Sequence, residues 1–271
     1  MILVNGTAGD AVSALDRGLG YGDGVFRTFL LRGGKPVLWR RHYAKLASDC
    51  NALGIACPAA DILTRDVETL AAGEPDSVVK IIVTRGSAPR GYAFSRTIAP
   101  TRIVSSSPMP AYPHEYYDRG VRVHRCRLRL AAQPALAGVK HLNRLEQVLA
   151  RAEWNDPAIA EGVLCDADDK IIGGVMSNLF LVRDGVLVTP DLKRCGVAGV
   201  TRALVLELAR ENGLAARIDE ICIDDLLAAE AVLLVNSVIG VWQVAALDRK
   251  TWRRSIFSDQ IGKWLEGARD D

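Results

Sequence analysis

The chain has 271 residues, of which 49% are apolar and 24% are charged, and its formal net charge is +2. This composition is typical of a globular protein with one large core or two smaller ones, and it excludes a disordered chain. The near-neutral charge indicates neither nucleic acid nor an anionic membrane surface as a partner.

The six cysteines are scattered, without a C-x-x-C pair or a nearby group of histidines. This arrangement argues against structural zinc and against a disulfide framework, so we expect reduced thiols, no metal and a cytoplasmic protein. The first ten residues lack a signal-peptide pattern. Polar residues interrupt the one long apolar run, residues 228–247, so we expect no membrane segment and predict a buried strand pair with a turn near Asn236.

Strand-like and helical segments alternate through the first hundred residues. In chain order, the predicted elements are strands at 2–5 and 25–31, helices at 40–55 and 59–73, and strands at 78–85 and 102–107. The first helix is indicated by apolar residues at helical spacing, and the second ends at Gly73, a residue that suits a C-cap. These elements predict a small α+β domain over residues 1–108.

Residues 109–120 combine proline, tyrosine and charge without periodicity, which predicts a linker to a larger domain over residues 121–271. The predicted elements there are strands at 121–128, 161–168, 178–185 and 186–190, and helices after Lys140 and at 201–213. The turn Arg183–Gly185 lies between two strand runs and is a hairpin signal. Apolar residues at 142, 145, 148 and 149 predict a helix with one buried stripe after Lys140.

Three motifs could carry chemistry. The segment "CGVAGVTR" places Gly199 and Thr201 at the start of a helix, where backbone N–H groups suit a phosphate, although a simple threonine cap is the commoner meaning. The loop "VTRGSAPRGY" contains Arg85, Arg90 and Tyr92, and arginine is the natural partner of a carboxylate, although loop arginines are more often solvated. The glycine-rich "DRGLGYGDGVFRTF" precedes a strand, so a dinucleotide site is a weak interpretation.

These motifs and four others occur in the order seen in one enzyme family. They are "DRGLGYGDGVFRTF", "HYAKL", "VTRGSAPRGY", "GVKHLNRLEQVLAR", "SNLFLV", "AGVTR" and "VNSVIGVWQV". Together they resemble the fold-type-IV pyridoxal-phosphate enzymes, which include branched-chain and D-amino-acid aminotransferases and 4-amino-4-deoxychorismate lyases. The contexts "KHLNRLEQ" and "NSVIGVW" resemble the lyase branch, and the resemblance covers essentially the whole chain.

The resemblance implies a two-domain α+β fold, with a small N-terminal α/β domain and a larger C-terminal domain built on a mixed, β-barrel-like sheet. It implies pyridoxal 5'-phosphate as cofactor, 4-amino-4-deoxychorismate as small-molecule substrate, 4-aminobenzoate and pyruvate as products, and a homodimer. Such an activity belongs to folate biosynthesis.

The resemblance also assigns roles to residues. Lys140 matches the lysine that binds the cofactor covalently and acts as the catalytic base. Cofactor-binding positions are matched by Lys45, Gly199, Val200, Thr201, Asn236 and Ser237. Substrate carboxylates are assigned to Arg90 with Tyr92, and Arg27 is a further candidate. His141, beside Lys140, is more simply a residue of the site wall than a proton relay.

Two positions depart from the family pattern. Lys45 stands where the family has an arginine on the phosphate, which keeps the charge but loses the bidentate fork. Gly173 stands where the family usually has a glutamate that pairs with the pyridine nitrogen. A carboxylate from Glu161, Asp166, Asp168 or Asp169 could replace it, but these four look like hairpin residues. We expect a lyase to tolerate this loss better than an aminotransferase, because forming an aromatic ring drives its elimination step.

Two other functions remain open. The first is a D-amino-acid or branched-chain aminotransferase on the same fold, which the "KHLNRLEQ" context and the missing glutamate disfavour. The second is a non-catalytic protein that senses cofactor or metabolite, which the intact Lys140 and "AGVTR" disfavour.

Overall fold

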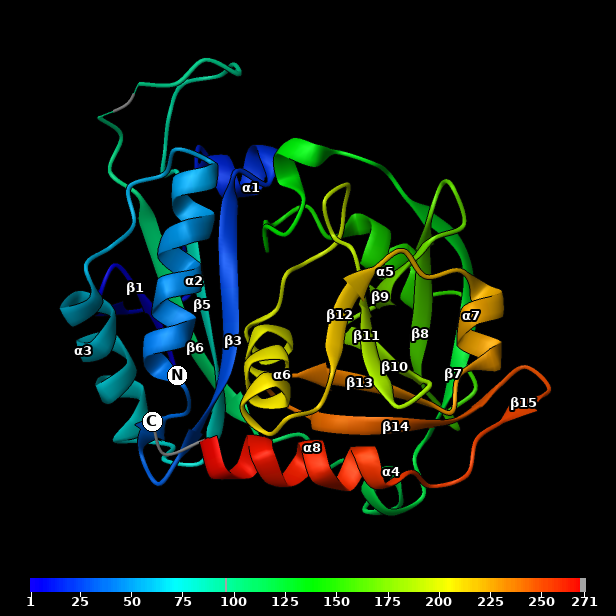
Figure 1. Ribbon diagram of the computed structural model, residues 1–271. Helices are drawn as coiled ribbons and strands as arrows, with labels where there is room; N and C mark the ends of the chain where they lie inside the picture. Colours follow the sequence, from blue (N-terminus) through cyan, green and yellow to red (C-terminus); the bar gives the residue numbers. More distant parts are fainter. Residues whose placement is uncertain (96, 269–271) are drawn as a thin grey trace. The chain divides into compact units, whose positions relative to one another are not determined.

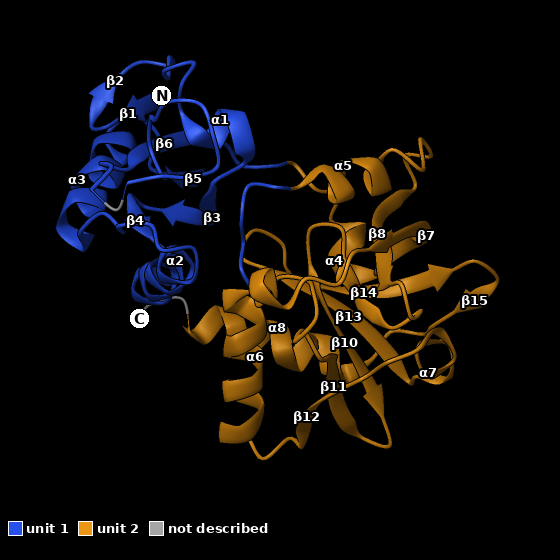
Figure 2. Ribbon diagram, turned by 90° about the horizontal axis from the view of Figure 1, so that it is seen from above, with its two compact units in different colours: residues 1–110, 139–143, 270–271 blue, residues 111–138, 144–269 orange. Residues whose placement is uncertain are grey.

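The computed structural model describes residues 1–95 and 97–268 and divides into two compact units, coloured separately in Figure 2. Unit 1 contains Met1–Pro110 and Val139–Asn143, and unit 2 contains Ala111–Gly138 and the described residues from Arg144 onward. We predicted Lys140 in the C-terminal domain, 121–271, but its segment packs with unit 1. The reason is backbone pairing: the Phe26 N–H donates to the Lys140 carbonyl at 3.0 Å, and the Leu142 N–H to that of Gly24 at 2.9 Å.

Unit 1 is built on a six-stranded sheet with the strand order β2-β1-β6-β5-β3-β4. Its elements are β1 (Ile2–Val4), β2 (Thr7–Ala8), α1 (Arg17–Tyr21), β3 (Gly24–Arg32), β4 (Lys35–Pro36), α2 (Trp39–Ala52), α3 (Ala60–Ala71), β5 (Ser77–Thr84) and β6 (Thr101–Pro108). All of its strand pairs are antiparallel. Helices α2 and α3 lie against the sheet (Figure 1), and a core that includes Phe29, Leu46 and Leu63 fills the space between them.

Unit 2 is built on a nine-stranded mixed sheet that runs β12-β11-β10-β13-β14-β7-β8-β9, with β15 paired to β14. Its elements are α4 (Glu115–Asp118), β7 (Val121–Leu130), the 3₁₀ turn η1 (Pro134–Leu136), α5 (Leu145–Arg151), β8 (Ile159–Asp166), β9 (Ile171–Gly174), β10 (Asn178–Arg183), β11 (Val186–Pro190), α6 (Val200–Glu211), β12 (Ala216–Asp219), α7 (Ile223–Ala228), β13 (Ala231–Asn236), β14 (Gly240–Leu247), β15 (Lys250–Thr251) and α8 (Ile256–Gly267). Helices α6 and α8 pack on β13 and β14. The predicted fold class, a mixed α+β fold with two separate sheets, is confirmed.

The strongest local signals are confirmed. The Arg183–Gly185 turn joins β10 and β11 in register, with Asp184 and Gly185 both at positive φ, as a type I′ hairpin requires. The predicted strand pair around Asn236 is β13 with β14. No helix among residues 1–95 and 97–268 has both the length and the apolar character to cross a membrane.

The predicted helix after Lys140 is present as α5, but its predicted start and its predicted buried stripe were wrong. The segment after Lys140 first runs as irregular backbone, and α5 begins only at Leu145. The expected buried stripe is exposed: Leu145, Val148 and Leu149 show 68%, 60% and 54% of their surface, and only Ala150 of this helix is buried. The apolar spacing was read correctly, but the stripe faces away from the core of unit 2.

Candidate active site

Lys140 is held by its backbone on both sides. Its carbonyl accepts from the Phe26 N–H at 3.0 Å, and its own N–H donates to Asp49 Oδ2 at 3.2 Å. The next residue, His141, forms an isolated antiparallel bridge with Val25. The Lys140 ammonium lies 4.9 Å from the centre of the Phe26 ring. The lysine is therefore positioned by β3 and α2, whose residues lie about one hundred positions earlier in the chain.

Cationic side chains in unit 1 lie around the buried carboxylate of Asp49. Asp49, on α2, is 1% exposed and forms ion pairs with Arg27 and Lys45. Burial lowers the pKa of Lys45 to about 8, with the Arg27 charge as a second cause, and burial lowers the pKa of Arg27 to about 10. Arg27 is only 3% exposed, and its Nε has no hydrogen-bond partner within the described chain.

His42, one turn before Lys45 on α2, belongs to the same group. Burial lowers its pKa to about 3, and the charges of Arg27 and Lys140 act in the same direction. The ring is therefore neutral at physiological pH. Its Nδ1 is buried and lacks a hydrogen-bond partner in the part of the chain that the structure describes. Two predicted residues, Arg27 and Lys45, thus share one buried cationic cluster, which would suit an anionic ligand.

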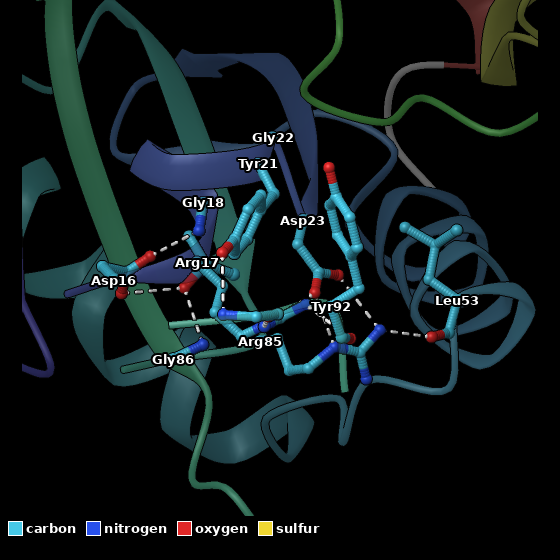
Figure 3. A network of polar contacts seen from close by, with 12 residues as sticks. Asp16, Arg17, Gly18, Tyr21, Gly22, Asp23, Leu53, Arg85, Gly86 and Tyr92 are labelled. Atoms are coloured by element: carbon cyan, nitrogen blue, oxygen red, sulfur yellow. Dashed lines mark hydrogen bonds and ion pairs between the residues drawn. The ribbon is translucent and has the colours of Figure 1, made fainter. Parts of the chain in front are cut away.

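The predicted substrate loop carries Arg90 and Tyr92 at its exposed end. Tyr92 is 85% exposed, and its ring lies 5.5 Å from that of Tyr21. Arg17 holds the loop by its backbone, donating to the Gly91 carbonyl at 2.7 Å and to the Tyr92 carbonyl at 3.3 Å (Figure 3). The two side chains available for a ligand therefore project from an anchored piece of backbone.

Arg85, which the sequence motif also offered as a partner of a carboxylate ligand, has a structural role. Its guanidinium bonds both oxygens of Asp23, at 2.8 and 3.0 Å, and also donates to the carbonyls of Leu53 and Gly54 (Figure 3). Burial alone would raise the pKa of Asp23, but Arg85 and Arg17 outweigh it and hold this pKa below its ordinary value. Arg85 is thus buried and hydrogen-bonded within unit 1, so it is not available to bind a substrate carboxylate.

In unit 2, the predicted phosphate site lies at the start of α6. Gly199 is the N-cap residue, and Thr201 is only 4% exposed. The Thr201 hydroxyl lies 3.2 Å from that of Ser237, in the turn between β13 and β14. The first N–H groups of a helix have no partners within the helix, and the dipole is positive there. Two hydroxyls at such a terminus are donors that fit a phosphate group.

The backbone before this helix is fixed by Asn178. Its Oδ1 accepts from the Gly199 N–H at 3.1 Å, and its Nδ2 donates to the Val197 carbonyl at 2.8 Å. A Cβ at position 199 would lie 2.2 Å from Asn178 Oδ1, so only glycine permits this approach. Asn236, the other predicted residue here, donates to the Met176 carbonyl at 3.1 Å. Its side chain therefore supports the site from within the fold.

Gly173 and its neighbour Gly174 end strand β9 beside a buried acid. Glu161, on β8, is 2% exposed, and its Oε2 would lie 2.9 Å from a Cβ at Gly174. Our interpretation of Glu161 as a hairpin residue was wrong, because it lies inside the sheet. Asp166, Asp168 and Asp169 do lie at the β8–β9 turn.

Asp49 and Asn178 were missed as site residues, and Glu161 was considered only as a possible partner of the ring nitrogen. The sequence signal for Asp49 was present, since it falls on the apolar face of α2 between Leu46 and Cys50. Asn178 and Glu161 had no comparable signal, because their roles depend on residues brought together by strand pairing.

Comparison with known proteins identifies the family of the chain. The family model for amino-transferase class IV matches residues 24–247. The chain belongs to this family.

Three similar proteins are two lyases and one putative aminotransferase. Over 247 residues the chain is 34% identical to an aminodeoxychorismate lyase of Vibrio harveyi, with 91% of each chain covered. It is 30% identical to a putative branched-chain-amino-acid aminotransferase of Methanocaldococcus jannaschii, covering 93% of this chain and 86% of the relative. The crystal structure of 4-amino-4-deoxychorismate lyase from Pseudomonas aeruginosa matches with a TM-score of 0.95 and 46% identity over the full length of both chains.

Proposed function

We propose that this protein is a pyridoxal-phosphate-dependent lyase that converts 4-amino-4-deoxychorismate to 4-aminobenzoate and pyruvate. Similarity to two lyases over nearly the whole chain supports the reaction. The structural observation that carries the proposal is the placement of Lys140, whose backbone is fixed on both sides and whose amine lies beside an aromatic ring and a cationic cluster.

The family resemblance assigns cofactor-binding roles to residues of each unit. In unit 1, Lys140 would hold the cofactor covalently, and Lys45 would supply positive charge to its phosphate. In unit 2, the Gly199–Thr201 turn and the Ser237 hydroxyl would bind phosphate oxygens, while the Asn236 side chain binds the Met176 carbonyl. When bound, pyridoxal phosphate supplies the electron sink for the bond that breaks in the substrate.

Lys140 would also move the proton that the reaction requires. Its amine, once free, takes the proton from C4 of the substrate ring as a general base. The C3–oxygen bond then breaks, the ring becomes aromatic, and the released enolpyruvate gains a proton at its methylene carbon to give pyruvate.

The substrate has two carboxylates, and we propose two places for them. Arg90 with Tyr92 is the first, because both project from backbone that Arg17 anchors. Arg27 is the second candidate. Its burial and its ion pair with Asp49 limit it to a ligand group that reaches deep into unit 1.

We further propose a cytoplasmic homodimer. The six cysteines are free thiols, as a reducing compartment requires. The exposed residues Leu145, Val148 and Leu149 form one apolar face of α5, and a second copy of the chain would cover it. Sedimentation velocity tests this assembly: Val148→Glu should shift a dimer toward monomer, and a monomeric wild-type protein would contradict it.

One set of assays tests the activity. Borohydride should trap pyridoxal phosphate on the peptide that contains Lys140, and Lys140→Ala should abolish this product. The wild-type protein should release pyruvate from 4-amino-4-deoxychorismate when no keto-acid acceptor is added. Lactate dehydrogenase provides the assay for this pyruvate. A requirement for a keto-acid acceptor would instead identify an aminotransferase, the second candidate, which the similarity to the Methanocaldococcus protein keeps open.

A further inference from the structure

The predicted cofactor residues of unit 2 are linked through one short turn, Val175–Asn178. At its end, Asn178 holds the backbone of Val197 and Gly199. In its middle, the Met176 carbonyl accepts from Asn236 at 3.1 Å. Since the Thr201 and Ser237 hydroxyls meet at 3.2 Å, the turn, the start of α6 and the β13–β14 turn form one closed hydrogen-bonded ring.

Glu161 lies beneath this turn and binds three of its residues. Its Oε1 accepts from the Val175 N–H at 3.1 Å, and its Oε2 accepts from the Met176 N–H at 3.1 Å and the Ser177 hydroxyl at 2.9 Å. The Gly162 N–H donates to Oε1 at 2.9 Å. Three of these four groups are backbone N–H donors, and the fourth is the Ser177 hydroxyl, so all four contacts hold the carboxyl group in place.

The same contacts decide how Glu161 can act. A carboxylate has about four acceptor sites, and four donors from the chain already occupy them. Burial raises the pKa of Glu161, and the four donors oppose that effect. Glu161 forms no ion pair with any residue in the described ranges 1–95 and 97–268. The residue is therefore placed to hold the turn, and its oxygens are already taken up by the chain.

We propose that Glu161 is the positioning residue for the cofactor site of unit 2: it fixes the Val175–Asn178 turn, and through Asn178 and Met176 it places Gly199 and Asn236. The inference rests on the proposed function, because the groups it places are those assigned to the cofactor. It gives Glu161 a role distinct from that of the ring-nitrogen glutamate, which this chain lacks at Gly173.

The glycine at position 174 fits this role. A Cβ there would lie 2.2 Å from the Ser177 hydroxyl and 2.9 Å from Glu161 Oε2, so any side chain would displace the carboxylate from the turn. The Gly174 N–H also donates to the Ser177 carbonyl at 2.8 Å, which closes the turn from the other side.

The same strand provides a matched control. Asp166, at the far end of β8, is also 2% exposed, and its Oδ1 also accepts from two backbone N–H groups, those of Asp168 and Lys170. It holds the β8–β9 turn and contacts none of the predicted cofactor residues among these bonds. Asp166→Asn and Glu161→Gln therefore both remove a buried carboxylate, but only Glu161→Gln should disturb the cofactor site.

The test measures pyridoxal-phosphate affinity of the full-length protein, stripped of cofactor, by quenching of tryptophan fluorescence. Because hydrogen bonds to a charged group are strong, we expect Glu161→Gln to raise the dissociation constant about tenfold or more and Asp166→Asn by less than about twofold. Thermal unfolding without cofactor should show comparable losses for the two variants. Ser177→Ala removes one donor only and should raise the dissociation constant about threefold.

The outcomes separate the two proposals. If the wild-type protein binds pyridoxal phosphate and both Glu161→Gln and Ser177→Ala bind it as tightly, the positioning role is wrong and the proposed function stands. If Glu161→Gln does not fold, an unchanged affinity in Ser177→Ala is sufficient to reject the role. If the wild-type protein itself binds no pyridoxal phosphate, the proposed function fails and the inference fails with it.

Discussion

Replacing Asp49 by asparagine should destabilise unit 1 strongly. Asp49 is 1% exposed and forms ion pairs with both Arg27 and Lys45, and its Oδ2 also accepts from the Lys140 N–H. The amide keeps the size of the side chain but removes its charge. Both cations then lose the counter-charge that Asp49 supplies.

The size of the expected loss of stability follows from the burial of the ion pairs that Asp49 forms. Removing one partner from a buried ion pair costs about 3–5 kcal/mol. Water reaches part of the Lys45 side chain, which is 23% exposed, so we expect the lower end of that range. For a chain of this size, about 3 kcal/mol corresponds to a fall of roughly 6–12 °C in the midpoint of thermal unfolding.

The assay compares Asp49→Asn with Asp61→Asn by scanning calorimetry at pH 7. Asp61 pairs with Arg65 at 3.1 Å on α3, but both side chains are more than 60% exposed, so its loss should cost no more than about 0.5 kcal/mol. Hydrogen exchange adds a local reading: the Lys140 amide should exchange faster in Asp49→Asn. If the two variants unfold at the same temperature and the Lys140 amide keeps its protection, the assigned role of Asp49 is refuted.

Three further changes test the site. The pKa of Lys45 is lowered from 10.5 to about 8. The free energy of unfolding of the wild-type protein should therefore rise between about pH 8 and 10.5, by up to about 1.4 kcal/mol per pH unit. Urea unfolding of Lys45→Met should lack this rise. Thr201→Val should raise the pyridoxal-phosphate dissociation constant about tenfold, and an unchanged value would remove Thr201 from the phosphate site. Gly173→Glu should increase transamination relative to elimination; a constant ratio of the two rates would contradict our account of the missing glutamate.

Local signals in the sequence predicted most of the elements. The β10–β11 hairpin was readable because Asp184 and Gly185 are residues that adopt positive φ at low cost. Helices α2 and α6 were readable because their apolar residues repeat at helical spacing. In both cases the information lies within one short segment, so no knowledge of tertiary packing was needed.

The error at α5 shows the limit of such patterns. Leu145, Val148 and Leu149 have the spacing of a helix that buries one face, and they do lie on one face of a helix. Spacing indicates that a face is apolar but does not indicate what covers it. The same pattern is produced by a helix that packs on its own core and by one whose partner lies outside the chain.

The candidate site was predictable where a residue's role depends on its neighbours in sequence. Lys140 and the Gly199–Thr201 turn lie in recognisable segments. The support beneath them was not predictable, because Asp49 meets the Lys140 backbone across 91 positions and Glu161 meets Val175–Ser177 across 14 to 16. A buried carboxylate is recognised only when its donors are known, and pairing of distant segments brings those donors together.

Asp49 and Glu161 perform the same task in their two units. Each is almost fully buried and accepts from the backbone. Asp49 accepts from the Lys140 N–H, and Glu161 accepts from the N–H groups of Val175 and Met176, in the turn whose Met176 carbonyl Asn236 binds. A carboxylate is the strongest acceptor available for fixing an N–H group in a dry environment. Glu161 does not contact the two hydroxyls proposed for the phosphate, because Thr201 and Ser237 contact one another. Asp49, in contrast, pairs with Lys45, the cation proposed for the phosphate. Glu161 can therefore hold the backbone without competing for the hydroxyl donors that an anionic cofactor requires, whereas Asp49 shares Lys45 with such a cofactor.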